Sequence, residues 1–279
     1  MSINCHYYQT DSDTSARFKH HRFYDFRSLD ARYQLHSNAF TDDWSIQTWG
    51  TAPAPSRPVR MQRIAQNVNI RHEKAKDSNS YLSLRASRTK DSYNTAEIEF
   101  KQQNILHASI RVRARVRGAA GACAGIFTYR DDSCESDIEM LTSDPTNRIH
   151  YTNQPGTDSN GEEMPDASTN MTLPGGARWT DWNDHRLDWT PETSAWYVNG
   201  ALATTKTYSI PKKASSVILN MWGDGGSWTG DMDVGASADL QVQWIEMVFN
   251  TTDIVPRSNK FTSQRDVVCL VDKVRRGRR

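Results

Sequence analysis

Apolar and polar residues alternate with a period of two along much of the first half of the chain. The alternation is clearest in the segments NVNIRH, YLSLRAS, YNTAEIEF and HASIRVRARVRG, which turn-forming residues separate. In the last segment, isoleucine, valine and alanine alternate with the row Arg111, Arg113, Arg115 and Arg117. Successive side chains of a β-strand point to opposite faces, so the pattern predicts short strands with one buried face. No segment has the periodicity of a helix of ordinary length, and we expect an all-β protein.

The pattern weakens toward both ends of the 279-residue chain. Residues 1–38 are polar and aromatic, and we expect this N-terminal extension, with its cluster HHRFYDFRSL, to pack on the exterior of the main domain. Residues 39–252 hold the predicted strands, and residues 253–279 form a C-terminal extension with a basic, solvated tail. One β-sandwich can exceed roughly 200 residues, so a single main domain is expected. Its nine Trp and ten Tyr residues suit both a β-sandwich core and a cleft.

The most unusual stretch is CESDIEM at residues 134–140. In a strand, Glu135, Asp137 and Glu139 share one face, while Ser136 and Ile138 point toward the core. Three neighbouring carboxylates repel one another, which raises the proton affinity of at least one of them and suits acid/base chemistry. The alternative is a solvated acidic edge strand that faces Lys or Arg side chains.

A second strand, YNTAEIEF, carries the carboxylate pair Glu97 and Glu99. The pair lacks a third acid, and pairing with Arg on a neighbouring strand is enough to explain it. We therefore expect a structural role for these two glutamates.

Five segments resemble, in the expected order, the sequence of glycoside hydrolase family 16. AGIFTYRDDSCESDIEMLT is similar to the strand, turn and active-site strand of that family, and IHYTNQPG to the strand that follows. DHRLDWTPETSAWYVNG, ILNMWGDGGSWTG and LQVQWIEMVFN resemble a strand–turn–strand unit, a Trp-bearing strand with its loop, and the closing strand. The resemblance covers about residues 40–250, and HHRFYDFRSL resembles a fungal branch of the family.

The resemblance implies a concanavalin A-like jelly-roll β-sandwich of two antiparallel sheets with a concave cleft. It implies a retaining endo-β-glucan hydrolase or transglycosylase, with a β-1,3- or β-1,3/1,4-glucan as the leading substrate. By position in the motif, Glu135 matches the nucleophile and Glu139 the general acid/base. Asp137 can hydrogen-bond Glu135, and its charge would disfavour ionisation of Glu139.

Substrate contacts follow from the same resemblance. Trp222 and Trp228 match cleft tryptophans, on which sugar rings can stack. Asn153 and Gln154 match positions where family members place substrate-contacting side chains. His185 lies beside a predicted cleft strand, where a structural role is the alternative.

No metal site or cofactor is expected. Many family members carry an acidic residue just before the Trp of the closing strand, at a structural calcium site. This chain has Gln243 there, and calcium prefers charged oxygen ligands. The four cysteines lack zinc-type spacing.

The cysteines allow two disulfides with three connectivities. Cys123 and Cys134 flank a predicted hairpin and can bridge across it, and Cys5 with Cys269 would then tie the two ends of the chain together. Buried free cysteines are the alternative.

The formal net charge of +1 gives no electrostatic case for nucleic acid as a partner. No apolar run approaches a membrane span, so no membrane partner is expected. The partner we expect is a β-glucan or another polysaccharide, bound by a monomer. MSINCHYYQT lacks the apolar core of a signal peptide. The protein is therefore either secreted or in the cell wall, with a leader removed, or intracellular.

Two other functions use the same residues. A lectin-like protein would bind carbohydrate without turnover, because fold does not settle function. An isomerase or cyclase would run acid/base chemistry on a non-sugar metabolite, which would suit an intracellular protein.

Overall fold

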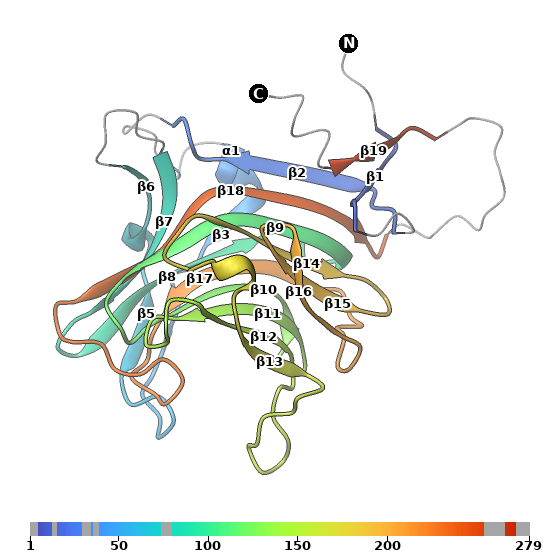
Figure 1. The fold of residues 1–279 in the computed structure, drawn as a ribbon. Coiled ribbons are helices and arrows are strands. Elements are labelled where there is room, and N and C mark those ends of the chain that lie inside the picture. Colours follow the sequence, from blue (N-terminus) through green and yellow to red (C-terminus); the bar gives the residue numbers. More distant parts are fainter. Residues whose placement is uncertain are drawn as a thin grey trace.

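The computed structural model describes residues 5–12, 16–29, 35, 39–73, 80–253 and 266–271. It confirms the prediction of an all-β protein, with strands that form curved antiparallel layers (Figure 1). The described helical segments are α1 (Ala39–Asp43) and the 3-10 turns η2 (Ala65–Asn67) and η3 (Pro174–Gly176). In this part of the chain no helix has the length and hydropathy needed to cross a membrane. The basic tail lies outside the described residues.

The layer that carries the acidic motif is called the β11 layer here. Its strands are, in order across the sheet, β13 (Ser168–Thr172), β12 (Arg148–Asn153), β11 (Cys134–Leu141), β10 (Cys123–Asp131), β17 (Ser216–Trp222), β8 (Ser92–Phe100) and β3 (Trp44–Ile46).

The opposite layer is called the β9 layer. Its strands are, in order, β16 (Ala201–Lys206), β15 (Ser194–Val198), β14 (Asn183–Trp189), β9 (Ile105–Gly118), β18 (Ser237–Thr251), β7 (Ser80–Arg88) and β6 (Val68–His72), with β2 (His20–Asp25) beside β18. The alternation in the sequence correctly predicts β6, β7, β8 and β9.

The two layers meet at their edge and share one core. β8 pairs with β17 within the β11 layer and also with β7 of the β9 layer. Short strands β4 (Gly50–Thr51) and β5 (Arg60–Arg63) continue from there, and β5 runs parallel to β8. Ile138 and Met140 of β11 enter the core together with Val112 of β9 and Leu240 of β18. The face of β11 that bears the acids is therefore turned away from the β9 layer.

The N-terminal residues take part in the sandwich. β2 pairs with the second half of β18, and Phe26 belongs to the main core with 3% of its surface exposed. Tyr24 is partly buried against the same core. These aromatic residues therefore extend the β9 layer instead of only covering its exterior, because the strand itself is hydrogen-bonded to β18.

One of the two predicted disulfides is present. Cys5 and Cys269 are bonded, and the strands that contain or follow them, β1 (Tyr7–Gln9) and β19 (Val268–Leu270), pair in parallel. The predicted bridge between Cys123 and Cys134 is wrong, since both are free and buried. Cys123 pairs with Leu141 at one end of the β10–β11 hairpin, whereas Cys134 pairs with Asp131 at the turn. The hairpin thus separates the two thiols by nearly its whole length.

Candidate active site

The acidic residues of β11 lie in the middle of the β11 layer. In the register with β10, Glu135 is opposite Tyr129, Asp137 opposite Phe127, and Glu139 opposite Gly125. Asp137 has 3% of its surface exposed, whereas both glutamates are partly exposed. The three acids therefore line one face, with the buried carboxyl between two that solvent can reach.

Burial and mutual repulsion shift the protonation of this trio. Burial raises the pKa of Glu135 to about 7, against a lowering by a hydrogen bond with Asp137 and a further increase from the charge of Glu139. Burial, followed by the charges of the two glutamates, holds the pKa of Asp137 well above its usual range. The raised pKa favours the protonated form of Asp137, which can donate to Glu135 in the hydrogen bond between the two side chains. The expected charge of Asp137 beside Glu139 stays a prediction, because the sequence does not reveal how deeply this carboxyl is buried.

Gln154 holds the middle carboxyl from the neighbouring strand end. Its Nε2 donates to Asp137 Oδ2 at 3.1 Å, its Oε1 accepts from the Gly156 amide at 2.8 Å, and its own amide donates to the Glu135 carbonyl at 3.0 Å. The structure thus brings Gln154 to the trio, where its side chain contacts Asp137.

Two donors converge on Glu139. The Cys123 thiol donates to Oε1 at 3.3 Å, and the Trp228 indole Nε1 donates to the same oxygen at 3.4 Å. Burial raises the pKa of Glu139, whereas these two hydrogen bonds and the nearby His150 lower it. The net effect is a raised pKa, so Glu139 binds its proton more tightly than a free glutamate although two donors stabilise its ionised form.

His150 completes the surroundings of Glu139. It is the partner of Glu139 in the register of β11 with β12, and its Nε2 lies 2.7 Å from Asp144 Oδ2. Its ring meets the Trp228 ring edge to face, with the centroids 5.0 Å apart. Asp144 and Trp228 thus fix the imidazole beside the carboxyl of Glu139.

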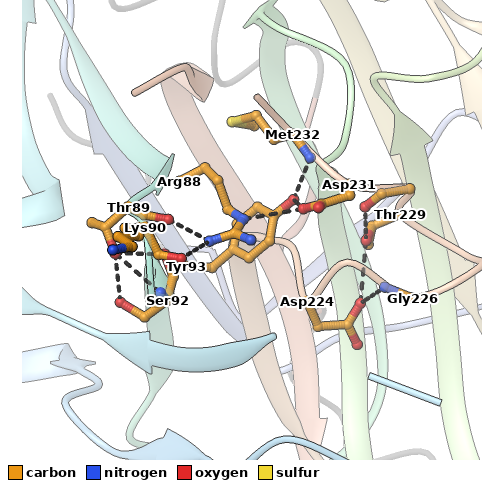
Figure 2. Close-up of polar contacts among 11 residues, drawn as sticks. Arg88, Thr89, Lys90, Ser92, Tyr93, Asp224, Gly226, Thr229, Asp231 and Met232 are labelled. Atoms are coloured by element: carbon orange, nitrogen blue, oxygen red, sulfur yellow. Dashed lines mark hydrogen bonds and ion pairs between the residues drawn. The ribbon is translucent and has the colours of Figure 1, made fainter. Parts of the chain in front are cut away.

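The loop that carries Trp228 is held by polar contacts on both sides (Figure 2). Asp231 Oδ1 accepts from the Tyr93 hydroxyl at 2.9 Å and from Arg88 Nε at 3.1 Å, and the Met232 amide donates to the Tyr93 oxygen at 2.6 Å. Asp224 Oδ1 accepts from the Gly226 amide at 2.9 Å. The bonds to Arg88 and Tyr93 fasten the loop to the end of β7 and the start of β8, and the Asp224 bond stabilises the loop itself. They support the exposed Trp228 at its position over Glu139.

Trp222 also reaches this face. It ends β17, pairs with Cys123 in the register, and is partly exposed. The structure therefore brings together Glu135, Asp137, Glu139, Gln154, Trp222 and Trp228.

Asn153 and His185 lie elsewhere. Asn153 is the register partner of Ser136, and its Oδ1 accepts from the Ser136 hydroxyl on the core side of the sheet. His185 lies on β14 in the β9 layer, paired with Val112, and has 1% of its surface exposed. Burial lowers the pKa of His185 to about 4. The structure thus places neither of these two side chains with the acidic trio.

Two residues near Glu139 were missed by sequence reasoning, namely Cys123 and His150. Both occupy the acid-bearing face because they stand on strands next to β11, at alternate positions from buried core residues. The alternation in AGACAGIFTY and RIHYTN carries this information, but only the register across the strands shows which residue lies beside Glu139.

The predicted structural pair lies on the same face, on β8, which β10 and β17 separate from β11. Glu97 is 4% exposed; its Oε2 is 2.8 Å from Arg63 Nη2 and accepts from Asn220 Nδ2 at 3.2 Å. Glu99 accepts hydrogen bonds from Gln47 at 3.0 Å and Gln103 at 2.9 Å. The expected pairing of this strand with Arg is confirmed at Glu97.

The position of the family's calcium does not suit a cation here. The Gln243 Oε1 atom accepts a hydrogen bond from Arg113 Nε at 2.9 Å, and Arg113 also pairs with Asp184 at 2.7 Å. A guanidinium already uses this oxygen, so the donor set does not fit a calcium ion.

Comparison with known sequences shows the family of this chain. The family model of glycosyl hydrolases family 16 matches residues 62–246. The β-glucanase of Paenibacillus polymyxa is 29% identical over 47% of this chain and 54% of its own length. The Crh-like protein 2 of Aspergillus fumigatus, a fungus, is 26% identical over 43% of this chain and 29% of its own length. The chain thus spans about half or less of these two relatives, and its fungal origin stays a prediction.

Solved structures share the fold. A β-1,3-1,4-glucanase (lichenase) from a mouse hindgut metagenome superposes with a TM-score of 0.59 at 18% identity, covering 83% of this chain and 99% of that one. The laminarinase catalytic domain of Thermotoga maritima gives a TM-score of 0.61 at 17% identity, with 83% and 97% covered. Because the family model matches most of the chain and this fold carries its acidic motif on the open face of one sheet, the chain belongs to family 16 of the glycosyl hydrolases.

Proposed function

We propose that the protein is a retaining endo-β-glucan hydrolase or transglycosylase in which Glu135 is the nucleophile and Glu139 the general acid/base. The observation that carries this proposal is the trio on β11, where three carboxyls share one accessible face and have raised pKa values. Perturbed carboxyls of this kind cluster at sites of acid/base chemistry. Family membership supports the class of reaction.

A retaining mechanism requires the carboxyl groups of Glu135 and Glu139 to approach each other. Retaining enzymes hold their two carboxyl groups about 5–5.5 Å apart, whereas Cα atoms four residues apart in a strand are separated by roughly 13 Å. The side chains of Glu135 and Glu139 must therefore lean toward each other over Asp137. A sugar ring bound across the strand would lie between them.

The chemistry divides between the two glutamates. Glu139 gives its proton to the glycosidic oxygen while ionised Glu135 attacks the anomeric carbon, and the bond to the leaving sugar breaks. Glu139, now ionised, takes a proton from water or from a sugar hydroxyl, which attacks the glycosyl-enzyme and releases Glu135. Asp137 supports the first step, because its hydrogen bond favours the ionised form of Glu135.

A β-1,3- or β-1,3/1,4-glucan is the substrate class we propose. The relatives named β-glucanase and the structures of a lichenase and a laminarinase support it. Trp222 and Trp228 offer aromatic faces beside Glu139, on which sugar rings can stack.

We also propose that the protein works outside the cytoplasm. The Cys5–Cys269 disulfide supports this location, because disulfides persist in oxidising compartments.

The test compares hydrolysis of laminarin and lichenan by the wild type, Glu135→Gln and Glu139→Gln. We expect each variant to lose about 10²- to 10⁴-fold in rate, as measured by reducing-sugar release. Glu192→Gln, in the exposed turn between β14 and β15, is the matched control and should keep the wild-type rate. Equal rates in the two site variants and the wild type would overturn the assignment of roles.

A second measurement separates the other functions. If the wild type binds laminarin but releases no sugar, and Glu139→Gln binds equally well, the protein is a lectin-like binder. If it neither binds nor cleaves either glucan, acid/base chemistry on another metabolite becomes the better explanation.

A further inference from the structure

Both hydrogen bonds to the carboxyl of Glu139 end on the same oxygen. Cys123 Sγ and Trp228 Nε1 lie 3.3 and 3.4 Å from Oε1. In the described part of the chain, no side chain forms a hydrogen bond to Oε2. The two oxygens of one carboxyl group therefore have different surroundings, which is relevant because an acid carries its proton on one of them.

The position of the thiol follows from the sheet. Gly125 is opposite Glu139, and Cys123, two residues earlier on β10, points to the same face. Cys123 is fully buried between Leu141 of β11 and Trp222 of β17, its partners in the register. Burial and then the charge of Glu139 raise the pKa of this thiol well above its usual value. It therefore stays protonated and acts as a donor.

We propose that Cys123 is a positioning residue for the general acid, which together with Trp228 makes Glu139 Oε1 an acceptor and reserves Oε2 for the proton. This inference rests on the proposed function of Glu139. In the first step the Oε2–H bond breaks, the proton passes to the glycosidic oxygen, and the electron pair of the broken C–O bond stays on that oxygen. The negative charge left on Glu139 is then stabilised at Oε1 by the S–H and N–H donors.

Other groups around Glu139 set the background for this effect. Glu135 and Asp137 face it from its own strand, Cys123 from β10, His150 with Asp144 from β12, and Trp228 from its loop. Within this set, the thiol is a donor that can be removed without changing the formal charge.

The test uses Cys123→Ala and Cys123→Ser, with Cys134→Ala as the matched control. Cys134 is the other free cysteine, at the far end of the hairpin and alternate with Glu135, so its side chain is on the core face. The measurement is kcat/KM against pH on the glucan that the wild type hydrolyses. For Cys123→Ala we expect kcat/KM to fall by about three- to tenfold. The alkaline limb of the profile, where Glu139 loses its proton, should move to higher pH by roughly one unit or less, because a donor to the ionised acid is lost. Serine should restore most of the rate, and Cys134→Ala should keep the wild-type profile.

The leaving group provides a second readout that a purely structural role would not change. A dinitrophenyl glycoside of a glucan oligosaccharide departs without help from an acid, so Cys123→Ala should hydrolyse it at nearly the wild-type rate. An equal loss on this substrate and on the glucan, or an alkaline limb that does not move, would overturn the inference. If Glu139→Gln keeps the wild-type activity, the proposed function itself fails, which is a distinct outcome.

Discussion

Strands β8 and β11 both present alternating acidic side chains to the same face of one sheet, but their surroundings differ. Glu97 of β8 is buried against the Arg63 guanidinium, which also stacks on the Trp49 ring at 3.5 Å. In the described part of the chain, no Lys or Arg pairs with Glu135, Asp137 or Glu139 on β11. Their partners there are neutral donors such as Gln154, Cys123 and Trp228.

The comparison shows that burial alone does not distinguish the two acidic strands. A buried acid with a counter-ion stays ionised and contributes to structure, whereas a buried acid without one binds its proton more tightly. The sequence patterns of the two strands are similar. The neighbours that supply or withhold a positive charge distinguish them.

The largest effect is expected when the cation beside Glu97 of β8, Arg63 of β5, is removed, because this removes the difference between the two acidic strands. Arg63→Met leaves Glu97 buried without its counter-ion, and we expect the free energy of unfolding to fall by about 3–5 kcal/mol. Urea denaturation followed by tryptophan fluorescence measures this change. The double variant Arg63→Met with Glu97→Gln should recover part of the loss. A single variant as stable as the wild type would show that the ion pair does not hold this strand.

Neutralising an acid on β11 should raise the free energy of unfolding instead of lowering it. The folded pKa of Glu135 is about 7, above the value of about 4.3 for a free glutamate, so the folded state binds the extra proton. The stability that protonated Glu135 contributes is present at low pH and is lost as pH rises from about 4 to 7. At pH 8, Glu135→Gln should therefore be more stable than the wild type by on the order of 1–3 kcal/mol.

The control for this prediction is the acid of β8. Glu97→Gln removes a charge that Arg63 needs, so it should lower stability at the same pH. Urea titrations at pH 4.5 and pH 8 would test both variants. If Glu135→Gln loses stability at pH 8 as Glu97→Gln does, the two acids are held in the same way.

The smallest expected effect concerns the middle carboxyl. The hydrogen bond from Asp137 lowers the pKa of Glu135, so Asp137→Ala should raise that pKa. The acidic limb of the profile of kcat/KM against pH, where Glu135 becomes ionised, should then move to higher pH by roughly one unit or less. Asp137→Asn keeps an amide donor and should move the limb less. A limb that moves equally in both variants would mean that the hydrogen bond does not carry the effect.

Much of the fold could be predicted from local pattern. Strands β6 to β9 follow the alternation of apolar and polar residues, and β11 follows from its motif. The acidic trio shares a face because side chains in a strand alternate, which needs no tertiary information.

The remaining site residues depend on pairing between strands. Asn153 is next to Gln154 in the sequence, but the side chain of Asn153 lies on the core face, where it accepts a hydrogen bond from Ser136. His185 shares a strand face with Leu187 and Trp189, both of which are buried. The period of two along this strand could therefore have placed His185 in the core. Cys123 required the register of β10 with β11, which the sequence does not state.

The disulfide between Cys5 and Cys269 makes the polypeptide between them a covalent ring. The two ends of this ring lie side by side, because β1 pairs with β19 (Figure 1). There, Tyr8 and Val271 pack with Val248 of β18. This corner is on the opposite side of the sandwich from β11, β12 and β13. A bead, a polymer or another domain attached beyond either cysteine would therefore be joined to the enzyme on the side opposite the acidic strand. Immobilised in this way, the protein would keep its acidic face turned away from the support and open to a polysaccharide in solution.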